Sequence, residues 1–212
     1  MMMRTFLVSV VVALLAGCGS VQGPAVKYYK LDIPPAPAPA GPSVPAPLRI
    51  EPFQTTGLLR QDRIVYRPSA VEVGFYEYHR WAERPNDTVT KALADRLTAR
   101  RLFQSVAISN GAESAEYVLR GSIDRLQEVD YKGAVRAQVS ISAELVDPVH
   151  QERIWASVAS SEFVVAKSDV QAVVTAMGRA SQQSVERLVT DIVTFVKANR
   201  LGAVSAADTP SR

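Results

Sequence analysis

The sequence predicts an α+β domain in which a single, largely antiparallel sheet is covered by two helices. Apolar and polar residues alternate almost without interruption over 134–148, and this period of two is typical of an antiparallel strand with one face in water. Segments 85–101 and 168–202 instead carry apolar residues at helical spacing. The predicted order is three strands, a helix, four strands and a helix, with an extra N-terminal strand possible.

The first three strands precede the first helix. LRIEPF (48–53) alternates apolar and charged residues, which indicates a short half-buried strand. After a turn at Gly57, RIVYR (63–67) predicts a second strand that ends at Pro68. The aromatic and β-branched residues of 71–83 predict the third strand.

The first helix is predicted to begin at Pro85, because Asn86, Asp87 and Thr88 follow it as helix-starting residues. It is expected to end near Arg100 and Arg101, where positive charge suits the carbonyl end of a helix. Its buried face should contain Val89, Ala92, Leu93, Leu97 and the aliphatic stem of Arg96.

Four strands should follow this helix. VAIS (106–109) is brief and closes at Asn110-Gly111, whereas 116–129, 134–148 and 152–165 are long. Asp147-Pro148 forms the last turn. The core-facing residues of the middle long strand are Val135, Ala137, Val139, Ile141, Ala143 and Leu145, and the intervening Arg136, Gln138, Ser140, Ser142 and Glu144 should face out.

The final helix carries the clearest pattern. Ser168 to Gln171 has the form of a capping box. The apolar stripe that follows comprises Val170, Val173, Val174, Met177, Ser181, Ser184, Leu188, Ile192 and Phe195. Residues 203–212 are expected to form a disordered tail.

The N-terminus has the pattern of an export signal. Arg4 precedes an apolar run over 6–16, and Leu15-Ala16-Gly17 leads into Cys18. The run is far shorter than the roughly 20 residues of a membrane-spanning helix. The signal peptide is therefore 1–17.

Cys18 is the only cysteine, so it cannot form an intramolecular disulfide. The LAGC ending resembles the bacterial lipobox, which implies cleavage before Cys18 and acylation (palmitate among the acyl groups) of its sulfur. No aspartate follows at Gly19 or Ser20, which in similar lipoproteins favours the outer membrane, on its periplasmic face. The alternative is an ordinary secretory signal with an incidental cysteine.

A tether of 18–47 joins the lipid to a domain of 48–202. PPAPAPAGPSVPAP (34–47) cannot build a core and should be a semi-rigid spacer. KYYKLDI (27–33) permits two interpretations: a strand that returns to the sheet, or part of the linker.

The bulk composition is that of a globular protein, with 47% hydrophobic and 21% charged residues. A net charge of +3 is too small to indicate a partner among nucleic acids. Hydrophobic burial must stabilise the domain, because no disulfide is possible.

No catalytic or metal-binding pattern is present. His79 falls inside a strand and His150 in a turn, and neither lies in a nucleophile elbow, a metal-ligand spacing or a glycine-rich phosphate loop. The sequence therefore predicts no enzyme, no metal and no cofactor other than the covalent lipid on Cys18.

Segment 57–85 is unusually rich in arginine and aromatic residues, which are enriched where proteins bind partners. The alternative is that the aromatic side chains pack beneath the helices and the arginines are simply solvated. The partner-binding candidates are Arg60, Arg63, Tyr66, Arg67, Tyr78, Arg80 and Trp81.

Four pieces of the chain carry a family resemblance: YYKL (28–31), LLR…RIVYR (58–67), YEYHRWAERP (76–85) and the Asp147–Trp155 hairpin. Together they resemble ABC-type transport auxiliary lipoproteins. The resemblance implies a non-enzymatic, periplasm-facing subunit of an intermembrane lipid transport system, with phospholipid or a related lipid as cargo. The implied partners are a mammalian-cell-entry-domain protein, an inner-membrane ABC permease and its ATPase.

Two other functions remain open from the sequence. One is an outer-membrane assembly lipoprotein that chaperones or plugs a β-barrel. The other is a lipoprotein hydrolase that uses His79 or His150. Neighbouring genes for a permease and an ATPase would favour transport over the first, and a broad esterase and glycosidase screen tests the second.

Overall fold

A computed structural model describes residues 23–35, 44–111, 115–131, 133–166, 169–199 and 201. The signal peptide, Cys18, the middle of the Pro/Ala tract, Ser168 and the tail at 203–212 lie outside the described residues.

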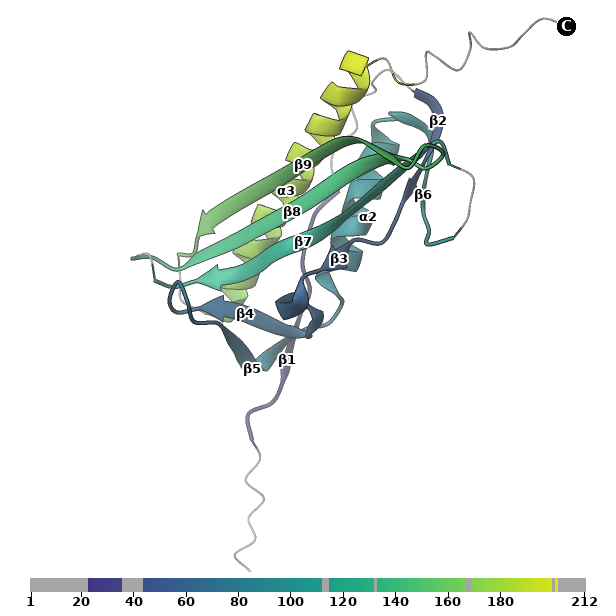
Figure 1. The fold of residues 1–212 in the computed structure, drawn as a ribbon. Coiled ribbons are helices and arrows are strands. Elements are labelled where there is room, and N and C mark those ends of the chain that lie inside the picture. The colour runs from purple at the N-terminus through teal and green to yellow at the C-terminus, as the bar shows by residue number, and fades with distance from the viewer. Residues whose placement is uncertain are drawn as a thin grey trace, which may run out of the picture.

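In the described part of the chain, a nine-stranded sheet carries two long helices on one face (Figure 1). The strands are β1 (Lys27–Tyr29), β2 (Val44–Ile50), β3 (Gln54–Thr55), β4 (Arg63–Arg67), β5 (Gly74–Trp81), β6 (Phe103–Ile108), β7 (Tyr117–Val129), β8 (Arg136–Asp147) and β9 (Glu152–Val164). The helices are α2 (Pro85–Ala99) and α3 (Val170–Asn199), with a 3₁₀ turn η1 at Gly57–Arg60. The α+β class is confirmed.

The predicted antiparallel character is only partly confirmed. β7, β8 and β9 are antiparallel neighbours, as are β4 and β5. However, β2, β3 and β4 lie one after another along the second edge of β7, and all three run parallel to it. β1 is parallel to β5, and β6 is parallel to β2. The sheet is therefore mixed.

The difference has a simple physical reason. Alternation of apolar residues reports which face of a strand is buried, but it does not report the direction of the neighbouring strand. β2 and β4 pair with β7 across a long stretch of sequence that includes α2 and β6. Only the packing of these distant segments decides that they run parallel.

β8 follows the predicted alternation, except that Ser140, a predicted outward-facing residue, is only 4% exposed. Ala137, Val139, Ile141, Ala143 and Leu145 are all buried.

β7 contains one irregularity that the sequence pattern does not show. Ile123 pairs with Ile141, but the next pair is Arg125 with Ser140, so Asp124 is an extra residue on β7. This β-bulge shifts the alternation by one position. Leu126 consequently faces the core and is 1% exposed.

The two helices bury the predicted faces, with one difference at each. In α2, the whole side chain of Arg96 is buried and not only its stem. In α3, the side chain of Asp169 accepts a hydrogen bond from the backbone N–H of Ala172 at 2.7 Å. Asp169 is therefore the N-cap, one position after the predicted start of the capping box.

The N-terminal segment belongs to the folded body, which decides between the two interpretations of 27–33. β1 pairs with β5, and Leu31 is 1% exposed within the core. The carbonyl of Asp32 lies against Gly178 of α3, and Arg96 donates to the carbonyl of Pro34 at 2.7 Å. The domain boundary predicted at Leu48 is too late, because 27–35 packs with both helices and β2 begins at Val44. The prediction that 34–47 cannot build a core is wrong at its end, since Val44 and Ala46 belong to the core cluster.

Candidate interaction surface

The arginine- and aromatic-rich segment folds into β4 and β5, with β1 added at the edge of the sheet. Tyr28 of β1 lies beside Arg80 of β5, and Arg63 of β4 lies on the other side of Arg80. Since alternate residues of a strand share one face, Tyr78 joins them. We call the surface of Tyr28, Arg63, Tyr78 and Arg80 the tether-side face.

The tether-side face is accessible and mixes aromatic rings with positive charge. Tyr28 is 64% exposed, and Arg63, Tyr78 and Arg80 are half-buried. Arg80 donates to Asp62 at 2.9 Å, and this contact raises the pKa of the guanidinium. Arginine and tyrosine both combine an apolar body with a polar tip, which suits a surface that meets a second phase or a partner.

Trp81 points to the opposite side of β5. It is 6% exposed and belongs to the core cluster, so its side chain is unavailable to a partner. Tyr29, which pairs with Trp81 from β1, packs against the same core. The Tyr29 hydroxyl and His79 Nδ1 are hydrogen-bonded at 2.8 Å, which attaches β1 to β5.

Burial lowers the pKa of His79, with a smaller contribution from the charge of Lys27. His79 therefore has the environment of a packing residue that joins two strands.

A second aromatic contact lies beside His79. The ring of Tyr76 stands edge-on to His79 at 5.5 Å and tilts against Tyr66 at 5.0 Å. Its hydroxyl donates to Glu128 at 2.8 Å, and burial is the main reason that the pKa of Glu128 is raised. Tyr66 thus packs against neighbouring side chains of the sheet and does not belong to the tether-side face.

The remaining two candidates lie apart. Arg60 is exposed at the end of η1. Arg67 donates to the carbonyl of Ala70 at 2.7 Å and so holds the β4–β5 loop. Of the seven predicted partner-binding residues, the structure brings only Arg63, Tyr78 and Arg80 onto one surface.

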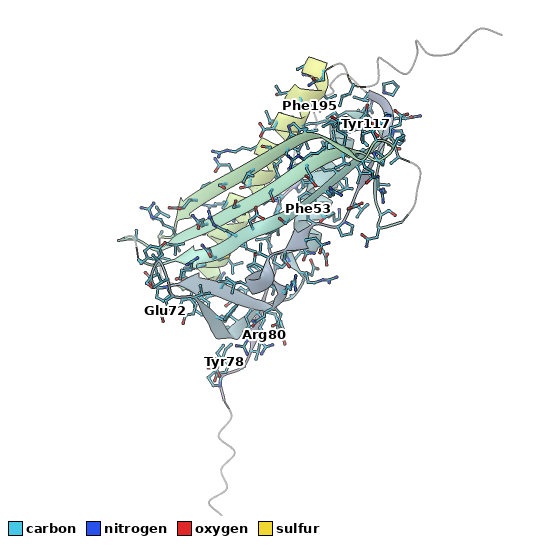
Figure 2. All side chains as sticks on the ribbon, viewed as in Figure 1. Phe53, Glu72, Tyr78, Arg80, Tyr117 and Phe195 are labelled. Carbon is cyan, nitrogen blue, oxygen red and sulfur yellow. The ribbon has the colours of Figure 1, made fainter. Side chains whose placement is uncertain are left out.

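Sequence reasoning missed Tyr28, the most exposed member of this surface. Its signal was present in the YYKL motif, because a strand places its two tyrosines on opposite faces. Figure 2 shows Tyr78 and Arg80 at the end of the molecule where the N-terminal segment leaves it, with Tyr117 and Phe195 at the other end.

The two histidines do not form a common site. His150 is in the β8–β9 turn, where its Nδ1 lies 2.8 Å from Asp147 Oδ2, whereas His79 is in β5. Among the described residues, no group of three or more His, Cys, Asp or Glu side chains is placed to hold a metal ion. Within the same residues, no helix is both long enough and apolar enough to cross a membrane.

Comparison with known proteins gives a family match. The model of the family described as ABC-type transport auxiliary lipoprotein component matches residues 29–189. No curated protein matches the sequence. The match extends from Tyr29, the last residue of β1, into the second half of α3. It includes Arg63, Tyr78 and Arg80 of the tether-side face, and Tyr28 lies just before it.

Two solved structures have a similar fold. One is protein XCC0632 from Xanthomonas campestris, of the DUF330 family, with a TM-score of 0.72 and 19% identity over 82% of this chain and 99% of that chain. The other is an uncharacterized protein with a TM-score of 0.61 and 15% identity over 80% and 99% of the two chains. At these identities the likeness concerns the fold alone.

Proposed function

Because the chain belongs to the family of ABC-type transport auxiliary lipoprotein components, we propose that it is a non-enzymatic, lipid-anchored subunit of an ABC-type intermembrane lipid transport system. The anchor is the acylated Cys18, and the domain faces the periplasm from the outer membrane. Its partners are the mammalian-cell-entry-domain protein, the permease and the ATPase of the same system.

The observation that carries this proposal is the extent of the family match. It covers α2, the strands from β2 to β9, and α3 as far as residue 189, so most of the folded body follows the family pattern. The sequence before the body ends in Leu-Ala-Gly-Cys, which supplies the lipid attachment that the family name requires. A globular domain held by such an anchor is concentrated at the membrane where its partners assemble.

The arrangement of polar groups supports a role in binding. Both histidines have structural partners, Tyr29 for His79 and Asp147 for His150. Glu128, whose pKa is raised, accepts a hydrogen bond from the Tyr76 hydroxyl. These groups thus contribute to packing and to turn formation, and the accessible surface is what remains for a partner.

The test is co-purification of the lipidated protein from membranes in mild detergent. We expect the permease, the ATPase and the mammalian-cell-entry-domain protein to be recovered with it. A Cys18→Ser form should be recovered without them, because it is not held at the membrane. Recovery of the lipidated protein alone would count against the proposed function.

A further inference from the structure

The distance between the predicted lipid and the folded body is short. Cys18 precedes Gly23, the first described residue, by five positions, and it precedes Lys27 of β1 by nine. A fully extended chain spans at most about 3.3–3.6 Å per residue, so the start of β1 can lie no more than about 32 Å along the chain from Cys18. The spacer of 36–43 does not lengthen this reach, because it follows β1 and the contacts of Leu31 and Pro34 with the body.

This limit decides which end of the molecule approaches the bilayer. α3 has 30 residues and is therefore about 45 Å long. The N-terminal segment leaves the domain beside β1 and β5, whereas β6 and the end of α3 lie at the opposite end (Figure 1). The short chain between Cys18 and β1 consequently holds the β1–β5 end close to the membrane.

The chemistry of this end matches a phospholipid surface. Tyr28 is 64% exposed, and Val26, just before β1, is 39% exposed. Arg80 lies next to Tyr28, and Arg63 lies on the other side of Arg80. Tyrosine is enriched at the level of the lipid headgroups, and arginine binds phosphate through its planar guanidinium.

The acidic residues near this end are already paired in part. Asp62 accepts from Arg80 at 2.9 Å, and Glu83 lies 3.6 Å from Lys30. These pairs reduce the repulsion that free carboxylates would experience from anionic lipid. Arg63, beside Arg80, adds positive charge to this face.

We propose that the tether-side face rests on the headgroups of the leaflet that holds the acyl chains of Cys18. Tyr28 and Tyr78 lie at the headgroup level, and Arg63 and Arg80 bind lipid phosphate. This inference rests on the lipid anchor of the proposed function. The anchored domain therefore has a fixed orientation, with the β8–β9 turn at Asp147–Glu152 pointing away from the membrane.

The test uses the full lipidated protein in vesicles of phosphatidylethanolamine and phosphatidylglycerol that contain a headgroup-labelled fluorescence quencher. Because Cys18 is the only native cysteine and its sulfur is acylated, one introduced cysteine can be labelled selectively. Glu77→Cys places a fluorophore at an exposed position of β5 beside Tyr78, because the Glu77 side chain is a hydrogen-bond partner of Tyr78. Val149→Cys places one in the β8–β9 turn, where Val149 is 80% exposed. We expect quenching at position 77 and none at position 149.

A second pair of variants separates contact by the face from proximity caused by the tether. Tyr28→Ser with Tyr78→Ser should abolish quenching at position 77, whereas Tyr→Trp at both positions should retain it, since tryptophan also favours the headgroup region. The matched control is Val158→Ser with Val164→Ser. These residues of β9 are 64% and 62% exposed, and their replacement should leave quenching unchanged.

The possible failures are distinguishable. Vesicle flotation reports the anchor alone, so loss of flotation would overturn the anchor and with it the inference. Flotation with equal quenching at both positions would overturn the inference and leave the anchor intact. If position 77 is not quenched and its fluorophore becomes protected from solvent when the transporter is added, the face binds a protein partner. This result would overturn the inference. If the lipidated protein is purified without the transporter but quenching at position 77 is preserved, only the proposed function is overturned.

Discussion

The guanidinium of Arg96 lies 2.6 Å from the carboxylate of Glu186 and joins α2 to α3. The arginine side chain is 1% exposed, while the glutamate side chain is 31% exposed. Arg96 also donates to the carbonyl of Ala92 on its own helix and to the carbonyl of Pro34. One buried cation thus joins both helices to the N-terminal segment.

Arg96→Ala is expected to lower the free energy of unfolding by about 2–3 kcal/mol, because the Pro34 carbonyl and the Glu186 carboxylate both lose a charged donor. Denaturant unfolding measures the change. Lys91→Ala is the matched control, since Lys91 forms an exposed pair with Asp95 on the same helix. That variant should lose less than about 0.5 kcal/mol. Equal losses in the two variants would contradict a special role for Arg96.

The same link should restrain the N-terminal segment. In Arg96→Ala, limited proteolysis is expected to cut the chain near 31–35 faster than in the wild type. Glu186→Gln should produce a smaller effect, because Arg96 keeps its bond to Pro34. Unchanged cleavage in Arg96→Ala would show that Leu31 and β1 hold the segment without it.

Gly178→Ala is expected to destabilise the protein although alanine is the better helix former by about 1 kcal/mol. A Cβ at Gly178 would lie 2.6 Å from the carbonyl oxygen of Asp32, and a backbone atom cannot easily move aside. Hydrogen exchange should show faster exchange of amides at 27–33. Gln183→Ala, at an exposed position of the same helix, should leave that exchange unchanged.

Gly121→Ala should be strongly destabilising, because a Cβ there would collide with the carbonyl of Ser142 and with the ring of Phe53. Overpacking of a buried site costs about 1–3 kcal/mol, and the rigid β8 backbone places this position at the upper end. Gly57→Ala is the control, since nothing lies within 4 Å of its Cβ position. Thermal unfolding should separate the two, and similar melting temperatures would contradict the close packing at Gly121.

The two histidines are expected to titrate on opposite sides of the ordinary value of 6.5. Asp147 raises the pKa of His150 through a hydrogen bond and its charge, while burial lowers the pKa of His79. NMR of the imidazole protons measures both. Asp147→Asn should return the pKa of His150 toward 6.5 and leave His79 unchanged.

The sign of the stability effect follows from these directions. Because the pKa of His150 is raised on folding, its pairing stabilises the protein below pH 6.5 and is lost as the pH rises through its folded pKa. The pKa of Asp147 is lowered from 3.8, so its contribution is lost as the pH falls through its folded pKa. His150→Ala should therefore destabilise the protein at mildly acidic pH and have little effect in alkaline solution.

Sequence by itself determined both helices, most of the strands and the buried faces of β8 and α3. The period of two in β8 identified its core residues, from Ala137 to Leu145, because alternation directly reflects burial on one side of a strand. The spacing in α3 identified Met177, Leu188 and Ile192 as core residues for the same kind of reason. The Leu-Ala-Gly-Cys pattern is likewise local, so it predicts the anchor without any knowledge of the fold.

Only the tertiary structure decided the features that depend on contacts between segments far apart in the sequence. The parallel pairing of β2 and β4 with β7, the burial of Trp81 and the meeting of Arg96 with Glu186 each join residues far apart in the sequence. Local periodicity carries no information on such pairings, because their energy comes from packing between elements. For the same reason, Tyr28, Arg63, Tyr78 and Arg80 became one surface only when β1 and β4 paired with β5.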